Sequence, residues 1–319
     1  MGKALVTGAT GFIGTHLIRA LLAEGHEVWG LSDRPRKELA IPGERFRLMD
    51  IRDVDPLRCF LDAARPEVIF HLAGLLKSDQ PEPLFQVNGV GTLMLFETLA
   101  GTGIRPLVVV ASSSAVYGPG QDESPILETQ PVRPVTPYGL TKVIQEEIAY
   151  RYFRTVGIPV ICTRAFNLVG PGQSPVLALS AFCRQIALAE AGEIPPVLRV
   201  GNLSAKRDFL DVRDAVRAMV LLARDGQPGE AYNICSQQAV GVQECLDHLV
   251  AQSRIPIEII RDPNLVQAND VPVQVGHFGK LHEATGWQPG WALWPSLSDM
   301  LEDWRENIRS GLGMLLQRP

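Results

Sequence analysis

Several features that define other classes of protein are missing from this chain. Although 46% of its residues are hydrophobic, no apolar run approaches the roughly 18–20 residues needed to span a bilayer. No run of Lys and Arg interrupts a formal net charge of −5, which argues against a nucleic-acid surface. No signal peptide is expected, because the first residues lead directly into a predicted strand. We therefore expect neither a membrane nor a nucleic-acid partner.

The chain is also poor in cysteine and histidine patterns. Its five cysteines include no CxxC pair and their number is odd, so a disulfide framework is not expected. Most of them stand in apolar segments, as buried free thiols do, which favours a reducing cytoplasm. The six histidines form neither HxxxH nor HExxH. We therefore predict no metal site.

What the sequence does contain is a regular alternation of strand and helix patterns over 319 residues. This alternation predicts an α/β fold with a doubly wound parallel (Rossmann) sheet, and the length favours a smaller second lobe. The continuous apolar run Leu107–Ala111 is typical of a central strand buried on both faces. Thr136 and Pro137 form a helix start, and Gly157 forms a stop. The predicted strands cover residues 4–7, 26–31, 45–50, 67–72, 106–112, 158–166 and 231–235, and the main predicted helices cover residues 12–22, 56–64, 85–99, 137–156, 176–191 and 212–224.

The rest of the chain is organised around a glycine-rich turn at residues 7–14. Gly8, Gly11 and Gly14 are three apart, follow the first strand and open the first helix, together with Phe12 and Ile13. Such a turn leaves the first helical amides and the helix dipole facing an anion, and the missing Cβ atoms let a pyrophosphate approach. This context predicts a dinucleotide site.

The end of the second predicted strand bears on the choice of cofactor. Asp33 is suited to the 2′-hydroxyl of the adenosine ribose and would repel a 2′-phosphate, whereas Arg34 or Arg36 would attract that phosphate. The expected cofactor is therefore NAD or NADP, with a slight preference for NAD.

A second group of residues is suited to carbonyl and alcohol chemistry. Tyr138 and Lys142 are four apart on one predicted helix face, and Ser113 stands at the end of the fifth predicted strand. The carboxyl ends of parallel strands share one edge with the glycine turn. There the Lys142 ammonium is expected to lower the pKa of the Tyr138 phenol, which then exchanges a proton, while Ser113 hydrogen-bonds the reacting oxygen. We predict these three residues to be catalytic.

At this point the chain resembles the extended short-chain dehydrogenases/reductases that act on nucleotide sugars, and in particular the GDP-4-keto-6-deoxy-mannose reductases. The resemblance covers essentially the whole chain. It is carried by residues 7–14, 50–51, 71–74, 88, 112–118, 138–142, 164–174, 200–214 and 232–236.

The resemblance implies roles for further residues. Asp50 and Ile51 would border the adenine, Asn167 would bind the sugar, and Arg207 would bind the substrate diphosphate. A planar cation with several donors suits a diphosphate, although Arg207 has the alternative of a surface ion pair with a nearby acid, Asp208 or Asp211. The resemblance also implies cofactor contacts from Leu72, Ala73, Gly74, Asn88, Tyr138 and Lys142, and substrate contacts from Lys77, Ser114, Val176 and Arg261.

The resemblance implies reduction of the 4-keto group of a nucleotide-linked 4-keto-6-deoxyhexose. The main alternative is a 4-epimerase, which uses the same three residues without consuming cofactor, and a non-catalytic dinucleotide sensor is a third hypothesis. A 4,6-dehydratase is not expected, because Ala115 stands where such enzymes place an acid. The chain also has Leu168 where relatives usually have His, and Gln267 where they have Arg.

Residues 1–166, completed by roughly 212–238, are predicted to bind the dinucleotide, and residues 167–211 and 239–319 to form the substrate-binding lobe. By analogy with the same family we expect a homodimer. Its contacts would come from the helices at 85–99 and 138–155, with Leu95, Phe96 and Tyr150 as candidates.

Overall fold

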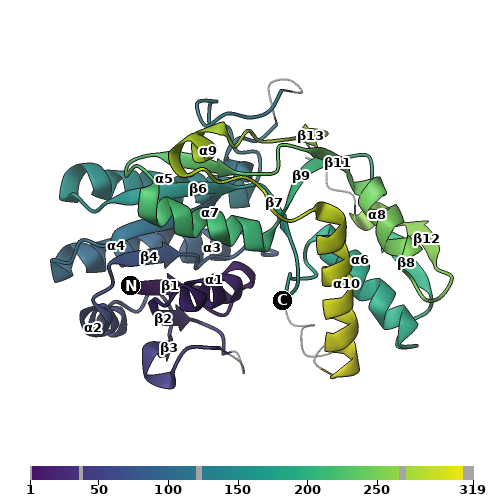
Figure 1. Ribbon diagram of the computed structural model, residues 1–319, viewed down its shortest axis with the longest axis horizontal. Helices are drawn as coiled ribbons and strands as arrows, with labels where there is room; N and C mark the ends of the chain where they lie inside the picture. The colour runs from purple at the N-terminus through teal and green to yellow at the C-terminus, as the bar shows by residue number, and fades with distance from the viewer. Residues whose placement is uncertain (1, 36–38, 120–123, 266–270, 312–319) are drawn as a thin grey trace.

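The computed structural model describes residues 2–35, 39–119, 124–265 and 271–311, and its largest element is a seven-stranded parallel sheet (Figure 1). The strands are β1 (Lys3–Thr7), β2 (Glu27–Ser32), β3 (Phe46–Leu48), β4 (Val68–His71), β5 (Leu107–Ser113), β6 (Val160–Ala165) and β10 (Ala231–Ile234). Their order is β3-β2-β1-β4-β5-β6-β10. The chain winds outward in both directions from β1, and ligands of such sheets bind where the winding reverses. The predicted doubly wound fold is confirmed.

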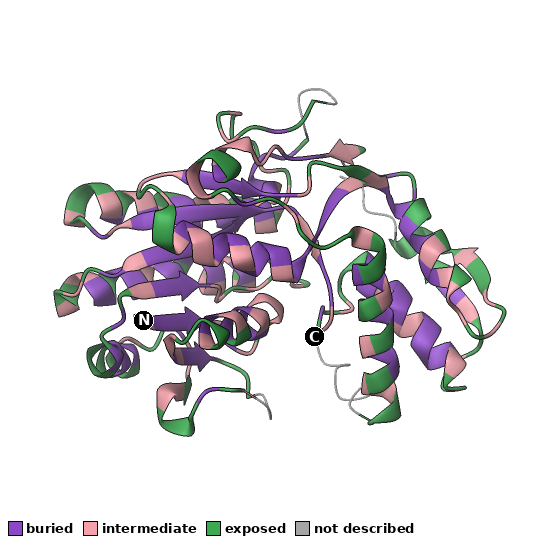
Figure 2. Cartoon of the chain, in the orientation of Figure 1, coloured by how far each residue is buried: buried purple, intermediate pink, exposed green. Residues whose placement is uncertain are grey.

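Two layers of helices cover the sheet because its strands are apolar on both faces (Figure 2). Side chains alternate along β5: Val109 joins the core under α1 (Phe12–Ala23) and α7 (Val212–Asp225), whereas Val108 and Val110 face the other layer. That second layer consists of α2 (Val54–Ala64), α4 (Gly91–Thr102) and α5 (Pro137–Val156).

The helix boundaries of α5 follow the local signals. Thr136 Oγ1 accepts a hydrogen bond from the Gly139 amide at 3.0 Å, Pro137 is the first helical residue, and Gly157 ends the helix with φ +74°.

The helix predicted at 85–99 is segmented. It consists of α3 (Pro81–Leu84), the π-helical turn η2 (Phe85–Val90) and α4. The short 3₁₀ turns are η1 (Gly43–Arg45), η3 (Ser114–Val116) and η4 (Pro263–Leu265).

The lobe lies to one side of the large sheet in Figure 1 and has its own core. Leu179, Phe182, Leu246, Leu301 and Trp304 pack together there. The spacing of Leu297, Leu301, Trp304 and Ile308 in the sequence predicts an apolar core stripe on the last helix, and the structure confirms it. The lobe contains β7 (Asn167–Val169), α6 (Ala178–Glu190), β8 (Val197–Val200), β9 (Lys206–Asp211), β11 (Ala239–Gly241), α8 (Val242–Ala251), β12 (Glu258–Arg261), β13 (Val273–Gln274) and α10 (Leu293–Arg309).

One segment within the predicted lobe packs on the dinucleotide-binding side instead. The helix α9 (Gly279–Thr285) lies against α7 and β10, and Trp287 is fully buried in the same core as α1. The indole of Trp287 donates to the Asp214 carbonyl at 3.1 Å. This segment therefore fastens the far end of the chain to the large sheet.

Two expectations about helix faces are wrong. Leu95 and Phe96 are fully buried in the core under α2, α4 and α5, so they are not available as dimer contacts. The helical spacing of Ile144, Ile148 and Tyr152 also predicts that they share the core face of α5. Tyr152 is buried, but Ile144 and Ile148 are only half-buried. The fully buried face of α5 instead contains polar side chains, namely Thr141, Lys142, Gln145 and Glu146.

Candidate functional site

The glycine turn lies against the end of β4. Gly8 has φ +68°, and a Cβ there would come within 2.9 Å of the Ala73 amide. A Cβ on Gly14 would come within 2.4 Å of the Gly8 carbonyl, so a side chain at either position would displace backbone. Gly11 caps α1 without a side-chain hydrogen bond, which leaves the amides at Phe12 and Ile13 directed to the sheet edge where an anion would be held.

The segment after β4 is positioned by buried polar groups. The amide of Ala73, next to Leu72, donates to Thr7 Oγ1 at 3.1 Å. The buried Asn88 side chain accepts from the Leu75 amide at 2.7 Å and donates to the Leu75 carbonyl at 3.0 Å. Asn88 also donates to Thr141 Oγ1 at 2.9 Å. Asn88 therefore ties the turn at Gly74 to α5, rather than offering a free amide to a ligand.

The candidate adenosine residues follow β2 and β3. Asp33 and Arg34 are both exposed, with their charged groups 4.0 Å apart. Ile51 is buried, and Asp50 pairs with Arg52 at 2.6 Å, an interaction that holds the pKa of the Asp50 carboxyl below its usual range. The structure thus places the acid Asp33 and the base Arg34 side by side, so it does not decide between NAD and NADP. Arg36, the other candidate base, lies outside the described residues.

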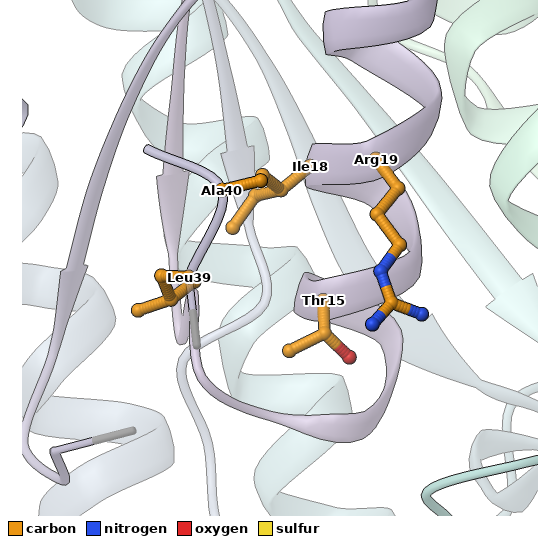
Figure 3. Close-up of a pocket in the computed structure, with 5 residues that line it drawn as sticks. All are labelled: Thr15, Ile18, Arg19, Leu39 and Ala40. Atoms are coloured by element: carbon orange, nitrogen blue, oxygen red, sulfur yellow. The ribbon is translucent and has the colours of Figure 1, made fainter. Parts of the chain in front are cut away.

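A pocket of about 270 Å³ adjoins this region (Figure 3). Thr15, Ile18 and Arg19 line it from α1, and Leu39 and Ala40 line it from the segment that follows β2. Arg19 is an exposed cation at this pocket. The pocket is lined by neither Tyr138 nor Lys142, so it lies apart from the catalytic candidates.

The three catalytic candidates come together at the ends of β5 and α5. Ser113 ends β5 and forms a side-chain hydrogen bond with Tyr138, which lies in the first turn of α5. One turn further on, Lys142 Nζ lies 5.6 Å from the centre of the Tyr138 ring. The same ammonium donates to the Ala111 carbonyl at 2.8 Å. A phenol, a hydroxyl and an ammonium therefore converge at this edge. They lie beside Gly74, because a Cβ atom added to Gly74 would come within 3.6 Å of Lys142 Nζ.

The electrostatics of this group differ from the expectation that Lys142 lowers the pKa of Tyr138. Burial raises the pKa of Tyr138 to about 12, although the hydrogen bond from Ser113 opposes the change. Burial also lowers the pKa of Lys142 to about 8, opposed by the nearby Glu146 carboxylate. At neutral pH the phenol is therefore protonated and Lys142 is mostly an ammonium. This state suits Tyr138 as a proton donor.

A substrate candidate beside them, Ser114, is held by a residue that the sequence analysis missed. Gln274 of β13 accepts from Ser114 Oγ at 3.2 Å and donates to the carbonyls of Ser114 and Gly118, each at 3.2 Å. The register of β13 pairs Gln274 with Arg207 on β9. No signal in the sequence links residues 160 positions apart, so only the fold reveals this connection between the lobe and η3.

Arg207 and Asn167 lie on neighbouring strands of the lobe. Asn167 Nδ2 donates to the Asp208 carbonyl at 3.3 Å, and Arg207 donates to the Lys206 carbonyl at 2.9 Å. The acids proposed as alternative partners of Arg207 are engaged elsewhere. Asp211 pairs with Arg213 at 2.7 Å, and the buried Asp208 carboxylate accepts hydrogen bonds from Ser236, Gln237 and Gly276.

The remaining substrate candidates lie on separate exposed segments. Lys77 follows β4, Val176 precedes α6, and Arg261 ends β12. Of the positions that depart from the family pattern, Leu168 packs partly buried against the core under α1, and Gln267 lies outside the described residues.

Ala115 is the third position that departs from the family pattern. Its backbone amide donates a hydrogen bond to Ser113 Oγ at 3.2 Å. Ala115 therefore helps to hold Ser113, although its side chain has no proton to give.

Two negative findings apply to the described part of the chain. Within it, no group of three or more His, Cys, Asp or Glu side chains is arranged to hold a metal ion. Among the same residues, no helix is both long and apolar enough to cross a membrane. The five cysteines are all free thiols; four are buried, as expected, and Cys59 is exposed.

Comparison with known proteins gives consistent relatives. The model of the NAD dependent epimerase/dehydratase family matches residues 4–235. The chain is 32% identical to a GDP-6-deoxy-D-mannose reductase of Pseudomonas aeruginosa over 96% of this chain and 98% of the relative. It is 30% identical to a UDP-glucose 4-epimerase of Mycolicibacterium smegmatis over 95% and 98% of the two chains.

A solved structure, that of RMD from Pseudomonas aeruginosa complexed with NADPH, superimposes with a TM-score of 0.84 at 31% identity. The match covers 96% of this chain and all of that one. The glycine turn, the parallel sheet and these relatives lead to one conclusion: the chain belongs to the NAD-dependent epimerase/dehydratase family and is an NAD(P)-dependent enzyme of the extended short-chain dehydrogenase/reductase type.

Proposed function

We propose that the protein reduces the 4-keto group of a nucleotide-linked 4-keto-6-deoxyhexose, in the manner of a GDP-6-deoxy-mannose reductase. The observation that carries this proposal is the convergence of Ser113, Tyr138 and Lys142 beside the glycine turn. The similarity to the reductase of Pseudomonas aeruginosa supports the substrate class.

The residues of the sheet edge fit a dinucleotide. The amides at Phe12 and Ile13 would hold the pyrophosphate, because the close backbone approach at Gly8 and Gly14 leaves that edge free of side chains. The Gly11 amide instead closes the turn by donating to the Gly8 carbonyl at 2.9 Å. Asp33, Arg34, Asp50 and Ile51 would surround the adenosine, and the backbone at Leu72, Ala73 and Gly74 would lie along the nicotinamide half. A reduced nicotinamide bound there supplies the hydride for the reaction.

Each catalytic side chain has a defined task in this proposal. Tyr138, protonated at neutral pH, donates its proton to the sugar oxygen as the hydride reaches C4. Ser113 donates a hydrogen bond to the same oxygen while negative charge develops on it. The Lys142 ammonium, 5.6 Å from the ring centre, stabilises the phenolate that remains. The protein thus orients both reactants and supplies the proton.

The lobe would close over the nucleotide sugar. Asn167 and Ser114 would contact the sugar, Arg207 would bind the diphosphate, and Lys77, Val176 and Arg261 would line the nucleotide end. In this division residues 1–166 with 212–238 hold the dinucleotide, and residues 167–211 with 239–319 hold the substrate, except that α9 and Trp287 pack on the dinucleotide-binding side. The register between Gln274 and Arg207 supports the idea, because it joins the diphosphate strand to the segment that carries Ser114.

A nucleotide-sugar 4-epimerase is the second candidate, favoured by the relatives with that activity. Cofactor turnover distinguishes the two functions. A reductase given a GDP-, dTDP- or UDP-linked 4-keto-6-deoxyhexose consumes NADH or NADPH in equal amount to the product. An epimerase interconverts UDP-glucose and UDP-galactose with no net consumption. Mass spectrometry of the nucleotides retained during purification would identify the base, and binding of dinucleotide without any turnover would favour the sensor hypothesis.

Two features of the structure support the expectation that the protein is not a 4,6-dehydratase. Dehydration needs a proton-carrying side chain beyond Tyr138, and Ala115 offers none. Glu128, a candidate replacement, accepts from the Asn233 amide at 2.8 Å and is therefore occupied at β10; Glu123 lies outside the described residues. Formation of a 4-keto-6-deoxy product from GDP-mannose, UDP-glucose or dTDP-glucose at enzymatic rates would contradict the reductase assignment.

We also propose that the protein forms a cytoplasmic homodimer. The free thiols support the compartment. The exposed apolar residues Val90 of η2 and Leu140 of α5, which are 37% and 42% exposed, support a dimer surface on these helices. The third candidate, Tyr150 of α5, is half-buried. Light scattering of the wild type and of Leu140→Glu tests this, since a monomeric wild type would refute it.

A further inference from the structure

A buried ion pair lies beneath the three catalytic candidates, and the proposed mechanism does not use it. Glu146 is one turn after Lys142 on α5 and is 3% exposed. Its carboxylate accepts from Arg164 Nε at 2.9 Å and from Arg164 Nη2 at 2.7 Å. It also accepts from Ser112 Oγ at 2.5 Å. Such a bidentate pair is rigid, and the negative charge of its acid raises the pKa of the Lys142 ammonium.

The pair joins the elements that carry the catalytic groups. Ser112 directly precedes Ser113 on β5 and is paired in register with Arg164 on β6. Lys142 donates to the carbonyl of Ala111, the residue before Ser112. Arg164 continues the network by donating to the Tyr117 hydroxyl at 3.0 Å. A movement of Glu146 would therefore displace the strand end on one side and Lys142 on the other.

The other groups around this pair carry no compensating negative charge. Burial lowers the pKa of His71 on β4 to about 3, so its imidazole is neutral. Its two ring nitrogens form hydrogen bonds with the hydroxyls of Thr7 and Thr92. Burial raises the pKa values of Tyr117 on η3, Cys162 on β6 and Tyr150 on α5, so all three are neutral as well. Glu146 is thus the negative group that acts on Lys142.

From this geometry we propose that Glu146 is a positioning residue, whose carboxylate, clamped by Arg164 and Ser112, is the counter-charge that maintains the Lys142 ammonium beside Tyr138. Loss of the charge leaves Lys142 buried without its stabilising neighbour, so the ammonium would lose its proton at a lower pH. The inference rests on the proposed function only where it speaks of catalysis, because the charge of Lys142 is measurable without substrate.

The decisive measurement is a pH titration of the protein with lysine labelled at ε-¹³C. The chain has six lysines, so the spectrum is simple, and the signal lost in Lys142→Met identifies Lys142. We expect a wild-type midpoint of about 8. Glu146→Gln keeps the shape and an acceptor oxygen, and we expect its midpoint to fall by about one pH unit or more. Glu146→Asp keeps the charge and should restore most of that shift.

Each result has a definite meaning. An unchanged Lys142 midpoint in folded Glu146→Gln overturns the proposal. If Glu146→Gln does not fold, the double variant Glu146→Gln/Arg164→Met removes the unpaired Arg charge and is the variant to titrate. Its midpoint should be lower than that of Arg164→Met, because these two variants differ only in the Glu146 charge, and equal values in the two would overturn the proposal in the same way.

Activity gives a second, separate readout. If the proposed reduction is correct, the alkaline limb of the kcat/KM profile should move to lower pH in Glu146→Gln together with the Lys142 midpoint. A shift of about one pH unit lowers activity at pH 8 about fivefold, while activity near pH 6 changes little. A merely structural role would lower activity at every pH and leave the limb in place. A wild type inactive on every 4-keto sugar would refute the proposed function, and the NMR titration would still decide the role of Glu146.

Discussion

The two edges that face each other across the proposed site are built in opposite ways. At the end of β5 and the start of α5, the polar groups are buried and bonded to one another, as Lys142, Glu146 and Arg164 show. On the lobe side, the substrate candidates Val176 and Arg261 are exposed and lie on separate segments.

The difference has a physical reason. A proton transfer depends on distances of a few tenths of an ångström, so its groups gain from rigid burial. Recognition of a nucleotide sugar depends on contacts spread over a larger surface, and exposed side chains can be substituted without disturbing the packing of a core. Changes at the catalytic edge should therefore alter the rate, and changes on the lobe side should alter affinity.

Tyr138→Phe tests the catalytic edge and has the largest expected effect. The substitution removes the proton donor but keeps the ring, so we expect kcat to fall by roughly 10²–10⁴-fold. Steady-state kinetics with a 4-keto nucleotide sugar measure this loss. Cofactor affinity and thermal stability serve as controls and should change little. Turnover near the wild-type value would remove Tyr138 from the mechanism.

Arg207→Ala tests the lobe side. Loss of hydrogen bonds between a cation and a diphosphate should weaken nucleotide-sugar binding by about 10–100-fold, while the affinity for the dinucleotide stays constant. Calorimetry with each ligand separates the two. Arg199→Ala is a matched control, because Arg199 is an exposed arginine of the same lobe, 3.9 Å from Asp262. Equal weakening of both ligands, or of neither, would contradict the assignment.

Asp33→Ala tests whether the adenosine end behaves like a recognition surface. Removing the acid takes away its repulsion of a 2′-phosphate and leaves Arg34 unopposed, so the preference for NAD over NADP should shift by about tenfold toward NADP. Affinities for both cofactors measure the shift, and Glu44→Ala on η1 is a control acid. If the wild type already has a clear preference for NADP, Arg34 dominates and the slight preference for NAD is wrong.

Gln274→Leu tests the contact between the two edges and should have the smallest effect. The variant loses hydrogen bonds to Ser114 and Gly118, which should raise KM by about 3–10-fold and change kcat less. Gln243→Leu is the control, since the Gln243 side chain donates to Asp247 at 2.8 Å on the exposed side of α8. A drop in kcat with constant KM would place Gln274 with the catalytic edge instead.

The sequence alone determined the order of strands and helices, the glycine turn and the pairing of Tyr138 with Lys142. These features are local: a strand pattern, a capping residue such as Thr136 and a spacing of four on a helix need only neighbouring residues. Ser113 also belongs here, because the end of a buried parallel strand predicts the edge of the sheet where it lies.

The tertiary structure decided which side chains are buried, and which distant segments are in contact. Periodicity marks Leu95 and Phe96 as apolar but does not say whether the core or a second subunit covers them, and the structure places them in the core. The spacing between Tyr138 and Lys142 predicts a lowered pKa for the Tyr138 phenol, but burial, which the sequence does not show, raises that pKa. The contact of Gln274 with Ser114 and the pair of Glu146 with Arg164 arise only when distant segments meet in the folded chain, because a pattern in the sequence contains no information on three-dimensional distance.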